Sequence, residues 1–163
     1  MPSKLIHDCG RILKDHGLTI AFAESATAGR LASEFSLCAD SGGVLKGGLV
    51  CYDAQVKENV LGIDPDLIQQ FTPESEEVTR ELAFRLRSLI TSDVQVAVTG
   101  LTTPGGSETP QKPVGTIFIH ILIKERSIAV RNVFYGTPEQ IVLLAADLAA
   151  KTIINELESS ESE

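Results

Sequence analysis

The sequence predicts an α/β protein, a three-layer α/β/α sandwich around a mostly parallel, mixed sheet with a late antiparallel hairpin. Short apolar runs alternate with segments of helical periodicity, which is typical of strands separated by helices. Two late β-rich runs are joined only across Lys124-Glu125-Arg126, which indicates a hairpin. The 163 residues suit a single hydrophobic core. We therefore expect one domain over residues 1–158 and a disordered acidic tail over 159–163 that has no apolar residue to anchor it.

The chain should begin with a helix, a strand and a second helix. Apolar residues at helical spacing follow Ser3, which would cap the first helix, and Gly17 would end it. The almost wholly apolar run 18–23 fits a strand that is covered on both faces. It leads directly into a turn at 24–29, from which the next helix should run to about Cys38.

A turn at residues 41–43 precedes a second extended run over 44–52. Gly47 and Gly48 within that run indicate a bulge or a close approach of another backbone. Residues 53–61 fit a short helix that carries Lys57.

Two further helices should follow, because Asp64-Pro65 and Thr72-Pro73 each place proline just inside a capped helix start. The second of them is expected over about 73–91, with Glu74 in its first turn, where the helix dipole favours acidic residues.

The last third of the chain should contain three strands and one helix. The apolar run 94–98 opens into a glycine- and proline-rich loop over 99–107, which we expect to be neither helix nor strand. The runs 116–123 and 127–135 should pair as an antiparallel hairpin. Residues 137–140, Thr-Pro-Glu-Gln, form a capping box that opens the final helix.

Composition argues against several classes of protein. A net charge of -8 disfavours nucleic-acid binding, and no apolar run approaches the ~20 residues that cross a bilayer. The N-terminus shows no secretory signal, so we expect a cytoplasmic protein without membrane or nucleic-acid partners. The scattered cysteines should be buried thiols and the scattered histidines should have surface or packing roles, so we expect no metal site (Cys9, Cys38, Cys51, His7, His16, His120).

Three segments rich in small or hydroxyl residues leave strand ends, at 24–29, 52–57 and 99–107. If those strands are neighbours, the segments converge on one crevice, because ligands of such sheets bind beyond the carboxyl ends of the strands. Taken separately, the segments could be a helix cap, a surface charge and a connector. Taken together, they offer Ser25 as a nucleophile and Lys57 as a base whose pKa is lowered by burial.

The strings at 24–29, 52–57 and 99–106, continued by Lys-Pro-Val-Gly-Thr at 112–116, resemble the CinA C-terminal domain family of competence/damage-inducible proteins. Active members of that family are nicotinamide mononucleotide deamidases, which hydrolyse the carboxamide to the acid and ammonia. The resemblance implies a catalytic dyad of Ser25 and Lys57, with backbone amides near Ala26 and Thr27 holding the oxyanion in the turn that includes Gly29. It implies no cofactor and no metal.

The resemblance further implies a small-molecule nucleotide substrate and a homo-oligomer. The residues expected to contact the substrate come from all three segments and from the lysine that follows the loop: Glu24, Tyr52, Thr99, Gly100, Thr102, Thr103, Gly105, Gly106 and Lys112.

The chain departs from the family pattern at several positions. Ala26 and Ala28 replace the cysteine and first glycine of Cys-Thr-Gly-Gly, and residues 136–138 and Val142 stand where the family favours two arginines. Loss of two cations that bind phosphate should weaken nucleotide binding at least about tenfold. Two alternatives to an amidohydrolase therefore stay open: a catalytically silent nucleotide-binding or regulatory domain, and a scaffold in a homo-oligomer.

Overall fold

A five-stranded mixed sheet forms the centre of the computed structural model, which describes residues 1–162. Its strands are β1 (Ile20–Glu24), β2 (Leu45–Val50), β3 (Val94–Gly100), β4 (Thr116–Ile123) and β5 (Arg126–Val133), in the order β2-β1-β3-β4-β5. Strands β2, β1 and β3 are parallel, whereas β4 is antiparallel to both of its neighbours. The predicted mixed sheet and late hairpin are confirmed.

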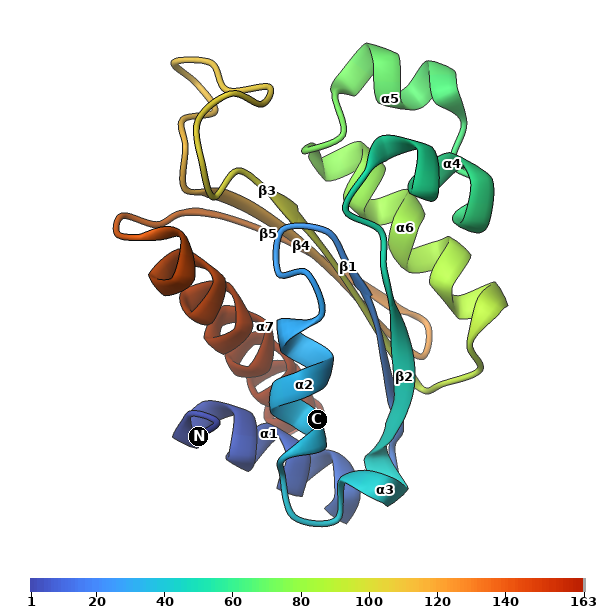
Figure 1. Ribbon diagram of the computed structural model, residues 1–163. Coiled ribbons are helices and arrows are strands. Elements are labelled where there is room, and N and C mark those ends of the chain that lie inside the picture. Colours follow the sequence, from blue (N-terminus) through green and yellow to red (C-terminus); the bar gives the residue numbers. More distant parts are fainter. Residues whose placement is uncertain (163) are drawn as a thin grey trace.

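Helices cover both faces of the sheet (Figure 1). One face packs against α1 (Lys4–Asp15), α2 (Arg30–Ser36), α3 (Ser41–Val44) and α7 (Pro138–Ser160), and the other against α4 (Ala54–Leu61), α5 (Pro65–Phe71) and α6 (Glu76–Leu89). Alternation along β1 serves both layers: Phe22 points to the first group of helices and Ala23 to the second. This burial on both faces explains why β1 is almost wholly apolar.

Several predicted caps are present. The Ser3 side chain accepts a hydrogen bond from the Ile6 backbone N–H at 3.3 Å and begins α1. Thr137 and Gln140 form the reciprocal capping box of α7. Asp53, a cap that was not predicted, accepts from the Gln55 N–H and sets the start of α4, the helix that carries Lys57.

Strand β2 contains both the bulge and the close approach to another backbone that its glycines indicated. The pairing of β2 with β1 shifts by one residue between Ile20 and Ala21, which is a bulge in β2 ahead of Gly47. A Cβ on Gly48 would lie 2.8 Å from the carbonyl oxygen of Phe22, so no side chain fits there.

The structure corrects four predicted boundaries. Residues 41–43 lie in the short helix α3 instead of a turn. Thr72-Pro73 does not open α6: Thr72 ends α5, and Ser75 caps α6 by accepting from the Val78 N–H. Strand β3 continues to Gly100, because its pairing with β4 extends to the last two residues. Helix α7 continues through Ser160, into the segment expected to be disordered, and Glu163 lies outside the described residues.

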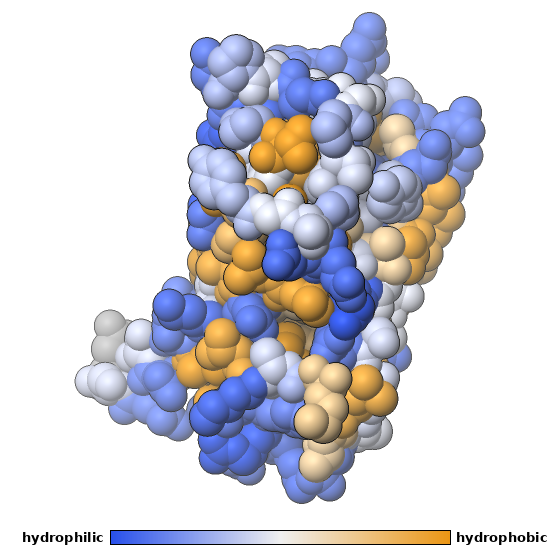
Figure 2. Space-filling view, turned by 60° about the vertical axis from the view of Figure 1, so that its left-hand side comes forward, coloured by the Kyte–Doolittle hydropathy of each residue, from blue (hydrophilic) through white to orange (hydrophobic). Residues whose placement is uncertain are grey.

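The face of the molecule in Figure 2 carries hydrophobic side chains in several patches among hydrophilic ones. Apolar residues are common on the surfaces of globular proteins. No helix within residues 1–162 combines the length and the apolar character needed to cross a bilayer.

Candidate active site

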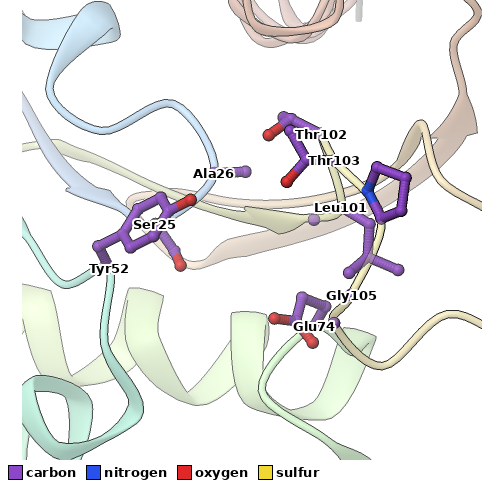
Figure 3. A pocket seen from close by; sticks show the side chains of 11 residues that line it. Ser25, Ala26, Tyr52, Glu74, Leu101, Thr102, Thr103 and Gly105 are labelled. Atoms are coloured by element: carbon purple, nitrogen blue, oxygen red, sulfur yellow. The ribbon is translucent and has the colours of Figure 1, made fainter. Parts of the chain in front are cut away.

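The carboxyl ends of β1, β2 and β3 meet at one edge of the sheet, because these three neighbouring strands are parallel. A cavity of about 230 Å³ opens beside this edge. All three segments predicted from the sequence contribute to its wall (Figure 3), which consists of Ser25, Ala26, Tyr52, Glu74, Gly100, Leu101, Thr102, Thr103, Pro104, Gly105 and Gly106. The segments therefore converge, as their positions after strands predicted.

Ser25 is fixed at the mouth of β1 by its own backbone. Its N–H donates to the carbonyl of Val98 on β3 at 3.0 Å, which continues the sheet by one residue. The side chain is buried and lines the cavity. A nucleophile held this way needs little reorganisation to meet a ligand in the cavity.

Lys57 lies behind Ser25, on the second turn of α4. Its side chain is only 1% exposed, and Nζ lies 3.0 Å from Ser25 Oγ. Nζ also donates to the carbonyl oxygens of Cys51 at 2.7 Å and Tyr52 at 3.2 Å. The loop that follows β2 therefore holds the amine against the serine.

Burial lowers the pKa of Lys57, because removal from water penalises the charged form, while electrostatic interactions with Cys51, Glu74 and Asp53 oppose the shift. In the uncharged amine, two N–H bonds can donate to the two carbonyls. The nitrogen lone pair is then directed at the Ser25 hydroxyl. The geometry can thus abstract a proton from Ser25 without a histidine.

Two amides of the turn after Ser25 have no acceptor within the described part of the chain, and one of them belongs to Ala26, a residue of the cavity wall. Within residues 1–162, neither the Ala26 N–H nor the Thr27 N–H has a hydrogen-bond acceptor. The turn is tight, with Ala28 at φ 47° and Gly29 at φ 93°, and a Cβ on Gly29 would lie 3.3 Å from Val50 Cγ2. These amides, and not the Ser25 N–H that Val98 occupies, are available to an oxyanion.

Glu24 is a structural residue, although the sequence analysis placed it in the substrate site. Its carboxylate is 1% exposed and accepts from Thr27 Oγ1 at 2.7 Å, the Leu31 N–H at 2.8 Å and the Ala32 N–H at 3.0 Å. It therefore satisfies the first turn of α2, which begins five residues after Ser25, at Arg30. The first N–H groups of α2 are thus bonded to Glu24 and not available at Ser25.

Two other residues expected to contact substrate also make hydrogen bonds within the protein. Thr99 is fully buried, and its Oγ1 lies 2.8 Å from Thr79 Oγ1 on α6. Lys112 Nζ donates to Thr72 Oγ1 at 2.6 Å, Ser107 Oγ at 2.7 Å and the Glu74 carbonyl at 2.8 Å. Lys112 thus anchors the loop after β3 to the connection between α5 and α6.

The glycines of the loop after β3 have different roles. A Cβ on Gly100 would lie 2.6 Å from the Thr116 carbonyl oxygen, and one on Gly106 would lie 2.7 Å from Leu101 Cδ2. The backbone contact requires glycine at position 100, whereas at position 106 a shift of the Leu101 side chain would make room for a Cβ. Gly105 has φ +97° and faces open space, so its backbone can approach a ligand. Thr102 and Thr103 line the cavity beside it.

Tyr52 and Glu74 complete the cavity wall. The Tyr52 side chain is 64% exposed and flanks Ser25 (Figure 3). Glu74 was expected in the first turn of a helix and was not predicted as a site residue. Because α6 starts later than expected, Glu74 lies ahead of its cap, Ser75, and contributes to the cavity wall. The pair Thr72-Pro73 resembled a helix start and concealed this position.

Burial of the three thiols agrees with the prediction: Cys9, Cys38 and Cys51 are buried and free. Within residues 1–162, no three side chains of histidine, cysteine, aspartate or glutamate form a group able to hold a metal ion. His120 is buried with its Nε2 2.7 Å from Ser127 Oγ, so its role is in packing.

Known proteins match almost the whole chain. Residues 2–157 match the model of the CinA C-terminal domain. A CinA-like protein of Thermotoga sp. is 35% identical over 151 residues, which are 93% of this chain and 36% of that protein. A CinA-like protein of Petrotoga mobilis is 37% identical over 131 residues, which are 80% of this chain and 32% of that protein. The chain thus spans about a third of the length of these relatives.

Solved structures agree with the fold. A CinA superfamily protein from Klebsiella pneumoniae has a TM-score of 0.90 at 26% identity, covering 96% of this chain and 97% of its own. A competence/damage inducible protein from Agrobacterium tumefaciens has a TM-score of 0.87 at 26% identity, covering 97% and 98%. The chain therefore belongs to the CinA C-terminal domain family.

Proposed function

We propose that the protein is an amidohydrolase that deamidates nicotinamide mononucleotide or a related carboxamide with Ser25 and Lys57. One observation carries the proposal: a lysine amine that is 1% exposed lies 3.0 Å from the hydroxyl of a serine in a cavity wall. Burying a lysine is costly unless its partners or its chemistry compensate. A buried lysine with a lowered pKa beside a cavity is a feature of functional sites.

In the first step, the uncharged Lys57 amine takes the Oγ proton of Ser25 while Oγ attacks the carboxamide carbon. The carbonyl π electrons move onto the substrate oxygen, which the N–H groups of Ala26 and Thr27 can stabilise. The two N–H bonds of the Lys57 amine already donate to two backbone carbonyls, so the amine does not have to rotate to accept the Ser25 proton.

In the second step, the C–N bond breaks and the Lys57 ammonium returns the proton to the departing nitrogen. Ammonia leaves, and an ester between the acyl group and Ser25 remains. A water molecule then attacks the ester, Lys57 again accepts a proton and gives it back to Ser25, and the free acid is released. Atoms and charge balance with water as the only co-substrate.

Ammonia release from nicotinamide mononucleotide tests the proposal. Replacing either dyad residue by alanine (Ser25→Ala, Lys57→Ala) should lower kcat by about 10³-fold or more, because the two groups act as one unit. Lys151→Ala, at an exposed position on α7, is the matched control and should keep wild-type activity. Circular dichroism of each variant verifies folding. Full activity in both dyad variants would rule out the mechanism.

A binding domain without turnover is the second candidate, and the same amine favours it. Nζ has three acceptors, Ser25 Oγ and two carbonyls, which is one for each proton of an ammonium. Such an ammonium would be stable and inert. Calorimetry that detects nucleotide binding, with no ammonia release at any pH up to 10, would identify this second function.

A further inference from the structure

Glu74 places a carboxylate in the wall of the cavity that contains Ser25. Ser107 Oγ donates to its Oε2, and within residues 1–162 its Oε1 has no hydrogen-bond donor. In the view of Figure 3, Glu74 lies across the cavity from Thr102 and Thr103. A ligand bound against Ser25 therefore meets a negative charge that the protein has only partly hydrogen-bonded.

The lining residues of the cavity include no lysine, arginine or histidine, although Lys57 and Lys112 behind the wall both interact with the Glu74 charge. The nearby cations have other partners. Lys57 Nζ and Lys112 Nζ each have three acceptors within the fold. Arg30 lies 2.6 Å from the Glu34 carboxylate and 3.8 Å from that of Glu139. The two lysine amines are therefore not free to bind phosphate, and the Nε of Arg30 is held by the Glu34 carboxylate.

The size of the cavity leads to the same conclusion. Sites that enclose drug-sized ligands measure roughly 300–1,000 Å³. At about 230 Å³, this cavity suits an aromatic carboxamide with part of its attached group better than a complete nucleotide. A phosphate attached to the far end of such a ligand would stay in solvent.

We infer that the site takes a carboxamide on a positively charged ring without a phosphate, with Glu74 as the residue that sets this specificity. The substrate class is an unphosphorylated pyridinium carboxamide nucleoside. Its cationic ring is attracted by the Glu74 carboxylate, whereas the phosphate of the corresponding nucleotide is repelled. This inference rests on the proposed function and determines which carboxamide the dyad hydrolyses.

Two substrates that differ only by a phosphate provide the test. Ammonia release is measured with nicotinamide riboside and with nicotinamide mononucleotide at one ionic strength. The wild type should have a kcat/KM about tenfold higher for the riboside, the size expected for one charge pair near a protein surface. Glu74→Gln should lower this ratio by about the same factor, because it should decrease kcat/KM for the riboside and increase kcat/KM for the mononucleotide. Glu77→Gln, an exposed residue of α6 outside the cavity wall, is the matched control and should keep the wild-type ratio.

The outcomes separate this inference from the proposed function. A wild-type preference for the mononucleotide, or equal ratios in the two variants, would overturn the inference while leaving the amidohydrolase intact. If neither compound releases ammonia, the proposed function fails. Binding of both compounds to the Ser25→Ala variant, measured by calorimetry, then decides: tighter riboside binding supports the role of Glu74, and tighter mononucleotide binding or no binding of either contradicts it.

Discussion

Glu24→Gln tests whether the buried carboxylate at the end of β1 holds the turn that follows Ser25. Glutamine has nearly the same shape as glutamate, but one carboxylate oxygen becomes an NH₂ group. The Glu24 Oε1 accepts from Thr27 Oγ1 and the Leu31 N–H, and Oε2 accepts from the Ala32 N–H. An amide can keep only one of these oxygens, so at least one buried donor must face another donor.

The cost follows from those contacts. Loss of a hydrogen bond to a charged group, with its donor left buried, is worth about 1.5–3 kcal/mol. Loss of a negative charge at a helix N-terminus adds about 0.3–1 kcal/mol. We therefore expect a loss of about 2–4 kcal/mol in the free energy of unfolding, out of roughly 5–15 kcal/mol for a typical domain.

Urea denaturation followed by circular dichroism measures this change. With a slope of about 1–3 kcal/mol per molar urea, the midpoint should fall by more than about 0.7 M. Glu81→Gln, the same chemical change in an exposed pair with Arg85, is the control and should cost less than about 1 kcal/mol. If the two variants lose the same stability, Glu24 does not hold the turn as described.

Three further predictions concern packing and protonation. Gly115→Ala should destabilise the fold by about 2–4 kcal/mol in urea denaturation, because Gly115 has φ +99° and an added Cβ would overlap the Phe134 carbonyl oxygen. The rate of ammonia release should rise with pH and reach half its maximum below pH 10.5, since only uncharged Lys57 is a base and burial lowers its pKa; a falling rate would contradict the dyad. Burial lowers the pKa of His120 from 6.5 to about 4. Between these pH values the histidine is protonated in the unfolded chain and neutral in the folded chain. Relative to His120→Leu, the wild type should therefore lose up to about 3 kcal/mol between pH 6.5 and 4, measured by urea denaturation at each pH.

The position of Lys57 next to Ser25 could be predicted because it depends on simple rules. Ser25 follows β1 directly and Lys57 lies in the short helix after β2, and the carboxyl ends of these parallel neighbours share one edge of the sheet. The order of strands and helices also predicted a layer of helices on each face of the sheet. What the pattern could not supply is distance: the 3.0 Å between Nζ and Oγ depends on the exact path of the chain from Cys51 to Asp53.

The sequence does not show which partner within the fold a polar residue will have. Glu24, Thr99 and Lys112 each looked available for substrate, yet each is satisfied by a residue distant in the chain or by a following turn. Glu74 was missed for the opposite reason. Thr72-Pro73 resembles a helix start, so Glu74 was expected inside the helix. The residue that caps α6 is Ser75, which follows Glu74.

Covalent labelling of Ser25 most directly tests whether Lys57 activates this hydroxyl, because it requires no knowledge of the substrate. The wild type and the Lys57→Met variant are treated with a serine-reactive fluorophosphonate, and peptides are mapped by mass spectrometry over time. The account predicts labelling at Ser25 in the wild type, at a rate that increases with pH and falls at least about 100-fold without the amine. Equal labelling rates in the two proteins, or no label on Ser25, would contradict it.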